Sequence, residues 1–411
     1  MLQRTLTSAE PTDLQAWLAR EADRCVKCGL CQPECPTYAL SRNEGDSPRG
    51  RIALIEGLAS GRLGPDPQVD RHLDNCLLCR RCESVCPSAV RFGALMDNAR
   101  QLTLNRRPSW LRWTADLVSR PALVGPLLRL GRLAPPMPGR IGQMVGLAHA
   151  ADRERPPAAG TYPAAAPQRG RVGLFLGCVG RHTHAHSLHA ALRLLRAAGF
   201  DVVVPPEQGC CGALHAHLGD TDRGKEYAAG VARVFDLGLD AIVSVATGCG
   251  AHLEDDPAHG ELPAPHADIL AFLARLDLES LRWRPLPGLA AIHTPCSQRN
   301  VLRADAAVTR LLHRIPELRL HPLPENERCC GAAGSYLLSH PETATRLRQP
   351  KLDAVAALRP DWLVTSNPGC ALHFVEGLRP LRRDLPVVHP VELLARQLVG
   401  PDDDATPPPA A

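Results

Sequence analysis

The chain has 411 residues, which is enough for two or three domains. Its 47 basic and 43 acidic residues leave a formal net charge of only +4, and aromatic residues make up 4%. A nucleic-acid-binding surface needs a concentrated basic patch and stacking aromatics, so we expect no nucleic-acid partner. No run of 18 apolar residues occurs, so no membrane-spanning helix is predicted.

The first residues show no basic stretch followed by an apolar core, so we expect no secretory leader. In a reducing compartment, the 16 cysteines are expected to bind metal rather than to form disulfides. Hydrophobic periodicity predicts one amphipathic helix over residues 11–26 and a second over residues 47–63.

Two cysteine runs flank the second predicted helix, and both spell C-x2-C-x2-C-x3-C-P. This spacing is the signature of a bacterial-type ferredoxin module with two [4Fe–4S] clusters. We therefore expect residues 1–100 to form a ferredoxin domain. Its predicted helices exceed those of a small ferredoxin, and the region resembles the helical ferredoxin domain of succinate dehydrogenase and fumarate reductase iron–sulfur subunits.

The fourth cysteine of each run ligates the other cluster in two-cluster ferredoxins. This rule assigns Cys25, Cys28, Cys31 and Cys86 to cluster 1, and Cys76, Cys79, Cys82 and Cys35 to cluster 2. The alternative is a pair of structural zinc sites, which also use C-x2-C pairs. Zinc sites rarely use four cysteines at this spacing, and rarely do so twice with the same trailing proline.

Residues 101–170 are expected to connect this domain to the rest of the chain, first as helices and then, over 154–170, as a Pro/Ala-rich linker. In one interpretation the helices pack between domains. In the other they dock on a membrane surface or a partner subunit through their interfacial tryptophans and arginines. The candidates are Trp110, Trp113, Arg112, Arg120, Arg129 and Arg132.

The remainder is an internal repeat of strand–helix alternation, over 171–285 and 286–400. Strands are predicted at 171–180, 201–206 and 241–247 in the first copy and at 289–296, 318–324 and 361–367 in the second. This alternation predicts an α/β layer in each half, and hence a mixed α+β and α/β chain. Residues 401–411 are expected to be a disordered tail.

Each repeat contains one cysteine, an adjacent Cys-Cys-Gly, and one further cysteine. The sets are Cys178, Cys210, Cys211 and Cys249, and Cys296, Cys329, Cys330 and Cys370. Adjacent cysteines rarely form a disulfide with one another, but both can ligate one metal centre. We therefore expect one or two further iron–sulfur or zinc sites. The alternative is that these cysteines are buried free thiols.

The repeated pattern resembles the cysteine-rich CCG domain of heterodisulfide reductase catalytic subunits, which binds an unusual [4Fe–4S] cluster or, in some members, zinc. The whole order, two ferredoxin motifs and two CCG domains, resembles the iron–sulfur subunits of bacterial glycolate oxidase. The runs CGLCQPECPTY, CLLCRRCESVCPSAV, GCCGALHAHLG and CCGAAGSYLLSHP carry this resemblance.

The resemblance implies an electron-transfer subunit of a glycolate dehydrogenase complex. FAD-containing partner subunits would oxidise glycolate to glyoxylate, and this chain would relay the electrons toward a quinone-type acceptor. It implies a cytoplasmic protein, or one that is peripheral on the cytoplasmic face of the inner membrane. No G-x-G-x-x-G fingerprint follows any predicted strand, so we expect neither a nucleotide-binding nor a catalytic residue on this chain. Alternatives are a disulfide reductase, or the iron–sulfur subunit of a lactate or glycerol-3-phosphate dehydrogenase.

One departure from heterodisulfide reductase lies at the end of each CCG motif. The family motif ends in C-x2-C, whereas His252 and His373 stand three positions after Cys249 and Cys370. Each half therefore offers four thiolates rather than five. The two histidines are candidates for extra ligands or proton carriers, and the alternative is that each lies on the surface. The histidines within 181–189 are expected to be solvated or to belong to a linker.

Overall fold

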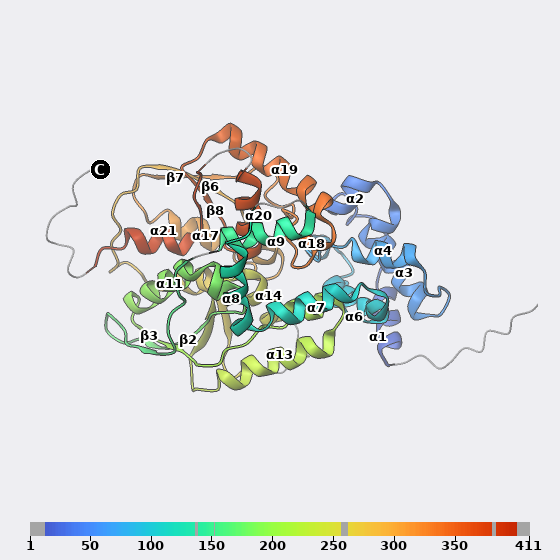
Figure 1. The fold of residues 1–411 in the computed structure, drawn as a ribbon, viewed down its shortest axis with the longest axis horizontal. Helices are drawn as coiled ribbons and strands as arrows, with labels where there is room; N and C mark the ends of the chain where they lie inside the picture. Colours follow the sequence, from blue (N-terminus) through green and yellow to red (C-terminus); the bar gives the residue numbers. More distant parts are fainter. Residues whose placement is uncertain (1–12, 136–138, 152, 256–261, 380–383, 401–411) are drawn as a thin grey trace, which may run out of the picture.

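The computed structural model describes residues 13–135, 139–151, 153–255, 262–379 and 384–400 (Figure 1). The predicted tail at 401–411 lies outside these ranges. A helical N-terminal region occupies one end of the molecule, and two β-sheets with their helices occupy the other. Within the described residues, no helix combines the length and the apolar character needed to cross a membrane.

The N-terminal region is helical, as the sequence predicts, and short loops that carry the cysteines join its helices. Leu18, Ile55, Leu73 and Leu95 are fully buried at its centre. The predicted helices at 11–26 and 47–63 correspond to α1 and α3, and Ser47 caps α3 through Gly50 N. The elements are α1 (Asp13–Asp23), α2 (Pro36–Ser41), η1 (Glu44–Asp46), α3 (Pro48–Ala59), α4 (Pro67–Asp74), α5 (Arg81–Ser84), α6 (Phe92–Thr103) and η2 (Leu104–Arg106).

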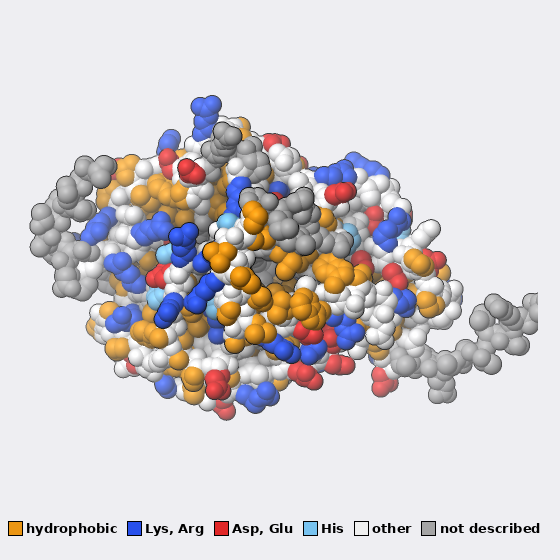
Figure 2. Space-filling view, viewed as in Figure 1, with side chains coloured by type: hydrophobic (Ala, Val, Ile, Leu, Met, Phe, Trp, Pro, Cys, Tyr) orange, Lys and Arg blue, Asp and Glu red, His pale blue; other side chains and the backbone are white. Residues whose placement is uncertain are grey.

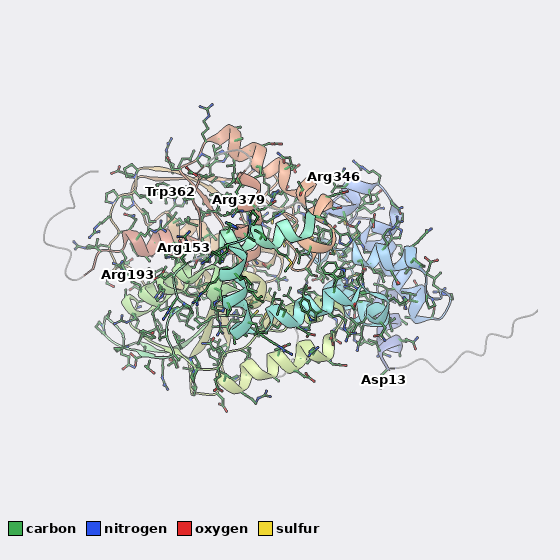
Figure 3. All side chains as sticks on the ribbon, viewed as in Figure 1. Asp13, Arg153, Arg193, Arg346, Trp362 and Arg379 are labelled. Atoms are coloured by element: carbon green, nitrogen blue, oxygen red, sulfur yellow. The ribbon has the colours of Figure 1, made fainter. Side chains whose placement is uncertain are left out.

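The connector forms helices α7 (Ser109–Val118), α8 (Pro121–Gly131) and α9 (Gly139–Ala150). One face packs against both halves of the repeat, through His182 to the Pro121 carbonyl and Arg379 to the Gly146 carbonyl. Figure 3 shows Arg379 beside α9. The outer face carries exposed apolar side chains, which form an orange patch in Figure 2. This outer patch comprises Trp113, Leu123, Leu127, Leu130, Leu133 and Met144.

Each repeat forms a sheet, and the two sheets share one strand order. The first sheet is β1-β3-β2-β4-β5 and the second is β7-β6-β8-β9. All pairs are parallel except β1 with β3, and β1 comes from the predicted linker, so part of the linker is an edge strand. The strands are β1 (Gly160–Tyr162), β2 (Gly170–Phe175), β3 (Phe200–Val204), β4 (Ala241–Ser244), β5 (His266–Asp268), β6 (Gly288–Ile292), β7 (Leu318–Pro322), β8 (Trp362–Val364) and β9 (Val387–Val388).

The two sheets are joined by helices that pack between them and share a single hydrophobic core. These are α11 (Ala185–Ala197), α15 (Ile269–Ala274), α17 (Asp305–Leu312) and α21 (Pro390–Gln397). The remaining helices are α10 (Gly180–Thr183), α12 (Ala213–Leu218), α13 (Thr221–Val234), α14 (Thr247–Asp255), α16 (Cys296–Asn300), α18 (Tyr336–Ser339), α19 (Pro341–Leu358) and α20 (Pro368–Leu378). The cysteines follow the carboxyl ends of the parallel strands, where α/β sheets build ligand sites.

Candidate metal centres

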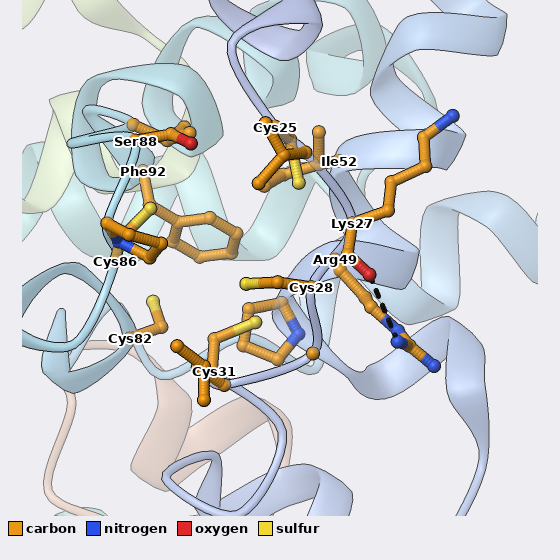
Figure 4. Close-up of a pocket in the computed structure, with 16 residues that line it drawn as sticks. Cys25, Lys27, Cys28, Cys31, Arg49, Ile52, Cys82, Cys86, Ser88 and Phe92 are labelled. Carbon is orange, nitrogen blue, oxygen red and sulfur yellow. Dashed lines mark hydrogen bonds between the residues drawn. The ribbon is translucent and has the colours of Figure 1, made fainter.

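A cavity of about 430 Å³, which includes open solvent, lies between the two ferredoxin-type loops (Figure 4). The structure brings together here the four cysteines assigned to cluster 1, although Cys86 comes from the other run. Cys82 lines the same cavity, beside Phe92 and Ile52. The cysteines at this cavity are Cys25, Cys28, Cys31, Cys82 and Cys86.

A second cavity, of about 310 Å³, is lined by Cys35, Cys76, Cys79 and Cys82, the set assigned to cluster 2. Four convergent thiols in a mostly apolar hollow are the donor set that a [4Fe–4S] cluster requires. Because Cys82 lines both cavities, the two sites are immediate neighbours. The geometry therefore fits two clusters with crossed fourth ligands.

The two loops have matching backbone conformations. Lys27 and Gly29 flank Cys28 with φ of 56° and 86°, and Leu78 and Arg80 flank Cys79 with φ of 51° and 57°. Left-handed residues on both sides of the second cysteine curl the loop, so that successive thiols face one volume. Only one of the four positions is glycine, and the repeated cysteine spacing alone does not reveal this conformation.

A buried arginine lies beside the cysteines assigned to cluster 2, and no sequence motif indicates it. Arg51 is 1% exposed, and its guanidinium approaches Cys35 Sγ at 3.8 Å while it donates to Thr37 and to the His72 carbonyl. Asp46 lies 3.5 Å from it. A buried positive charge and hydrogen bonds at the sulfur stabilise the negative charge of a thiolate-bound cluster.

In the first half, the four repeat cysteines converge beyond the carboxyl ends of the parallel strands. The Sγ atoms of Cys178 and Cys210 lie 3.5 Å apart, and Cys210 and Cys211 are buried. Hydrogen bonds from Cys178 and Cys211 lower the pKa of Cys210, so one sulfur of the group is favoured as thiolate. Cys211 in turn contacts both Cys210 and Cys249, and these two contacts raise the pKa of Cys211.

The second half repeats this arrangement. Sγ atoms of Cys330 and Cys370 lie 3.3 Å apart, and those of Cys296 and Cys329 lie 3.9 Å apart. Hydrogen bonds from Cys329 and Cys370 lower the pKa of Cys330. In both halves, four sulfurs, buried or half-buried, contact one another in sequence and form a soft-donor set that fits an iron–sulfur or zinc centre.

The glycine of each Cys-Cys-Gly run is required by its backbone conformation. Gly212 and Gly331 both have φ of 92°, and each backbone N–H donates to the first sulfur of its pair at 3.4 Å. A Cβ would lie 2.3 Å from the Gly224 carbonyl oxygen in the first half and 2.7 Å from the Ala344 carbonyl oxygen in the second. Glycine therefore lets α13 in the first half and α19 in the second approach the Cys-Cys pair closely.

A buried amide side chain fixes each Cys-Cys loop against the strand that precedes the single cysteine. Gln208 accepts from Leu176 N and donates to the Leu174 carbonyl. Asn326 accepts from Thr294 N and donates to the Ile292 carbonyl. The shorter Asn stands one position further from its Cys-Cys pair, which accounts for 32 rather than 31 residues between the first two cysteine positions of the repeat.

The first-half site is covered by the connector. Ser119 donates to Cys210 Sγ at 3.4 Å and lies 3.5 Å from His215 Nδ1. The other ring nitrogen of His215 contacts Asp116 at 3.0 Å, and Arg223 pairs with Asp116 at 2.8 Å. A chain of polar side chains therefore leads from the half-exposed Asp116 and Arg223 to one sulfur of this site.

The second-half site is covered by the ferredoxin region instead. Cys79 of cluster 2 packs in one cluster with Cys296, Cys329 and Leu77. Asn300 donates to the Cys79 carbonyl at 2.7 Å, and the Tyr336 hydroxyl donates to Asn75 at the same distance. Cys296 and Cys329 of this half thus lie next to a cysteine of the set assigned to cluster 2.

The two histidines predicted as extra ligands or surface residues are both buried. His373 contacts the Ala344 carbonyl through Nε2 and Arg348 through Nδ1, while the ring of His252 stacks edge-on against His217. The structure instead brings His293 to the second-half site. Its ligand atom and the sulfurs of Cys330 and Cys370 lie within 4.8 Å of one another.

The histidines at 181–189 are less solvated than expected. His182 contacts the Pro121 carbonyl at 2.9 Å, and burial lowers the pKa of His184 to about 4. His186 is exposed, but it pairs with Glu154 at 2.5 Å. These side chains therefore hold helices α10 and α11 against their neighbours.

Comparison with known proteins agrees with this architecture. The profile of the 4Fe-4S dicluster domain matches residues 21–90, and that of the cysteine-rich CCG domain matches residues 172–254 and 290–375. A solved structure of a hypothetical protein from Helicobacter pylori has a TM-score of 0.41 at 11% identity, over 85% of this chain and 76% of that chain, which carries no functional information.

Three curated relatives extend over most of the chain. A dihydromethanophenazine:CoB–CoM heterodisulfide reductase component of Methanosarcina barkeri is 24% identical, over 97% of this chain and 99% of that protein. The glycolate oxidase iron–sulfur subunit of Escherichia coli is 33% identical, over 88% of this chain and 92% of that protein. The probable glycolate oxidase iron–sulfur subunit of Bacillus subtilis is 33% identical, over 90% and 92% respectively. The chain belongs to the family of glycolate oxidase iron–sulfur subunits.

Proposed function

We propose that this chain is the iron–sulfur electron-transfer subunit of a glycolate-oxidising dehydrogenase complex. The observation that carries the proposal is the similarity to glycolate oxidase iron–sulfur subunits over about nine tenths of the chain. The convergence of all 16 cysteines into four neighbouring groups gives that similarity a physical basis.

The substrate chemistry belongs to partner subunits in this proposal. Oxidation of a 2-hydroxy acid releases a hydride, which a flavin accepts, whereas an iron–sulfur cluster accepts single electrons. FAD-containing partners would therefore oxidise glycolate to glyoxylate and pass electrons one at a time to this chain. Its thiolates hold the clusters, and buried groups such as Arg51 adjust their potentials.

The ligand sets proposed for the ferredoxin region are Cys25, Cys28, Cys31 and Cys86 for one [4Fe–4S] cluster, and Cys35, Cys76, Cys79 and Cys82 for the other. The cavities that these sets line support the assignment. The two repeat sets supply one further metal centre in each half.

The packing of Cys79 against Cys296 and Cys329 supports a route from cluster 2 into the second half. From there, α16 contacts α14, where Ser297 donates to Thr247 at 2.8 Å. Thr247 is two residues before Cys249, so the two half-sites are also neighbours. Electrons would thus pass through the ferredoxin clusters, then the second half, then the first.

The outer patch of the connector supports delivery to a quinone-type acceptor at a membrane surface. Exposed leucines on α8, with Arg120 and Arg129 exposed beside them, match the amphipathic pattern of helices that lie in an anionic interface. Co-sedimentation with anionic vesicles tests this point. The native chain should sediment with anionic vesicles and bind little to neutral ones. The double variant Leu127→Glu, Leu130→Glu should no longer sediment with the anionic vesicles.

The proposal as a whole is tested with the purified complex. Glycolate-dependent dye reduction is measured for the flavoprotein partners with and without this chain, together with the iron and zinc content of the chain. Dye reduction that is unchanged when the chain is omitted would contradict the proposal. Disulfide turnover by the isolated chain, lost in Cys330→Ser, would support the disulfide reductase alternative instead.

A further inference from the structure

The two half-sites differ at one structurally equivalent position. Gln208 bonds to Leu174 and Leu176, and Asn326 bonds in the same way to Ile292 and Thr294. The residue between each bonded pair is therefore equivalent, and it is Phe175 in the first half but His293 in the second. Phe175 packs against Phe235 with ring centroids 6.2 Å apart, whereas His293 faces sulfur.

A neighbouring hydroxyl group fixes the His293 ring. Thr365 Oγ1 lies 2.9 Å from His293 Nδ1, and Phe374 packs edge-on against the ring at 4.8 Å. Ser244 occupies the position of Thr365 in the first half, as the strand registers show, and it contacts His266 instead. With Nδ1–H donating to Thr365, the lone pair left for a ligand is that of Nε2.

His293 and its two sulfur neighbours form a compact ligand group. All three side chains are buried, and their ligand atoms lie within 4.8 Å of one another. Thiolates and a neutral imidazole together bind iron–sulfur clusters or zinc. Among the described residues, the first half has no comparable group that includes a histidine.

We propose that His293 is a ligand of the metal centre in the second half, which therefore has a mixed thiolate–imidazole shell, while the first-half centre is bound by thiolates. The inference rests on the part of the proposed function that places metal in both halves. A neutral ligand lowers the negative charge of a centre and raises its reduction potential. The second-half centre is thereby suited to draw electrons from the adjoining cluster 2.

The test compares the full chain with His293→Cys and His293→Phe. The first keeps a metal-binding side chain, and the second reproduces the residue of the first half. Each protein is labelled with 15N-histidine, and nitrogen coupling to its paramagnetic centres is measured by ENDOR. Zinc and iron are counted, and any zinc is examined by EXAFS for nitrogen neighbours. His373→Phe serves as the control. Both ring nitrogens of native His373 already contact protein groups, the Ala344 carbonyl and Arg348, so its removal should leave the bound-nitrogen signal unchanged.

The expected result is a directly bound histidine nitrogen in the native chain and in His373→Phe, and its loss in both His293 variants. His293→Cys should keep the metal content of the native chain, which separates ligation from folding. A histidine signal that persists in His293→Cys, a native chain with metal but no bound nitrogen, or a chain with metal only in its ferredoxin region would overturn the inference. The glycolate assay is a separate readout. Dye reduction that does not depend on this chain, together with an intact nitrogen signal, would count against the proposed function alone.

Discussion

The two halves of the repeat share one strand order, the same Cys-Cys-Gly geometry and the same buried amide, yet their sites face different surroundings. The first-half site lies under the connector, where Ser119 and His215 lead toward the surface. The second-half site lies against the ferredoxin region, beside Cys79. A duplicated fold can thus place two similar groups of thiols in different surroundings, because the covering segment differs.

The proposed difference between the two half-sites is tested most directly by removing one site at a time. Cys296→Ser should prevent glycolate-driven reduction of both half-sites, whereas Cys178→Ser should affect only the first. The reason is that the proposed route passes from cluster 2 through the second half-site to the first. In Cys296→Ser, the rate of glycolate-driven reduction of the half-sites should fall on the order of tenfold or more. EPR of the complex frozen after glycolate addition measures each centre, and dithionite reduction shows which are present. Unchanged first-half reduction in Cys296→Ser would reverse the proposed order.

A second prediction concerns His389, which makes one of the contacts between the two halves. His389 caps α21 by accepting from Val391 N, and its Nε2 contacts the Val245 carbonyl of the other half. Burial, and then the nearby His184, lower the pKa of His389 to about 3. The neutral ring therefore stabilises the fold above the unfolded-state pKa of about 6.5, and this contribution is lost as pH falls below it, by up to about 1.4 kcal/mol per pH unit.

Unfolding of the native chain and of His389→Asn, followed by far-UV circular dichroism between pH 7.5 and 4.5, measures this effect. The variant should be less stable at pH 7.5 and should lose less stability on acidification. Cluster absorbance recorded in parallel shows any acid loss of iron separately. Equal pH slopes in the two proteins would show that another group causes the acid sensitivity.

The third prediction compares the two Cys-Cys-Gly runs directly. Gly212→Ala and Gly331→Ala should each lower stability by about 1–3 kcal/mol, because both force a side chain into a left-handed conformation against a carbonyl oxygen. Gly212→Ala should cost more, since its Cβ would lie 2.3 Å from the oxygen rather than 2.7 Å. Gly238→Ala is the control, because its φ is 63° and no atom lies within 4 Å. Equal effects of all three in thermal unfolding would mean that the close approach contributes nothing.

Much of this architecture is predictable from sequence because its signals are local. The cysteine spacings predict the four groups, and the strand–helix alternation predicts an α/β layer in each half. The parallel pairing and the shared strand order come from the structure. The features that depend on distant segments are not predictable in this way. His293 lies three residues before Cys296 in an ordinary strand end, and only the fold places it beside Cys330.

The covering segments show the same limit. Ser119 is far from Cys210 in sequence. In the same way, no sequence signal connects Arg51 to Cys35, or Cys79 to Cys296. His252 and His373 show a related limit: their repeated position after a cysteine does not reveal that both are buried rather than on the surface. Repetition in sequence therefore predicts what the halves have in common, whereas their differences come from tertiary contacts.

The smallest expected effect isolates one such contact. Ser119→Ala removes the hydroxyl that donates to Cys210 Sγ and leaves the sulfur ligands in place. Since a hydrogen bond to a ligand sulfur stabilises the reduced, more negative state, the variant should lower the reduction potential of the first-half centre. The second-half centre should keep its potential, because Ser119 does not contact it. A redox titration followed by EPR resolves the two, and Ser119→Thr, which retains the donor, should restore the native value. A shift of both centres together would mean that the halves are coupled as one unit, and the division of roles between them would then have to be abandoned.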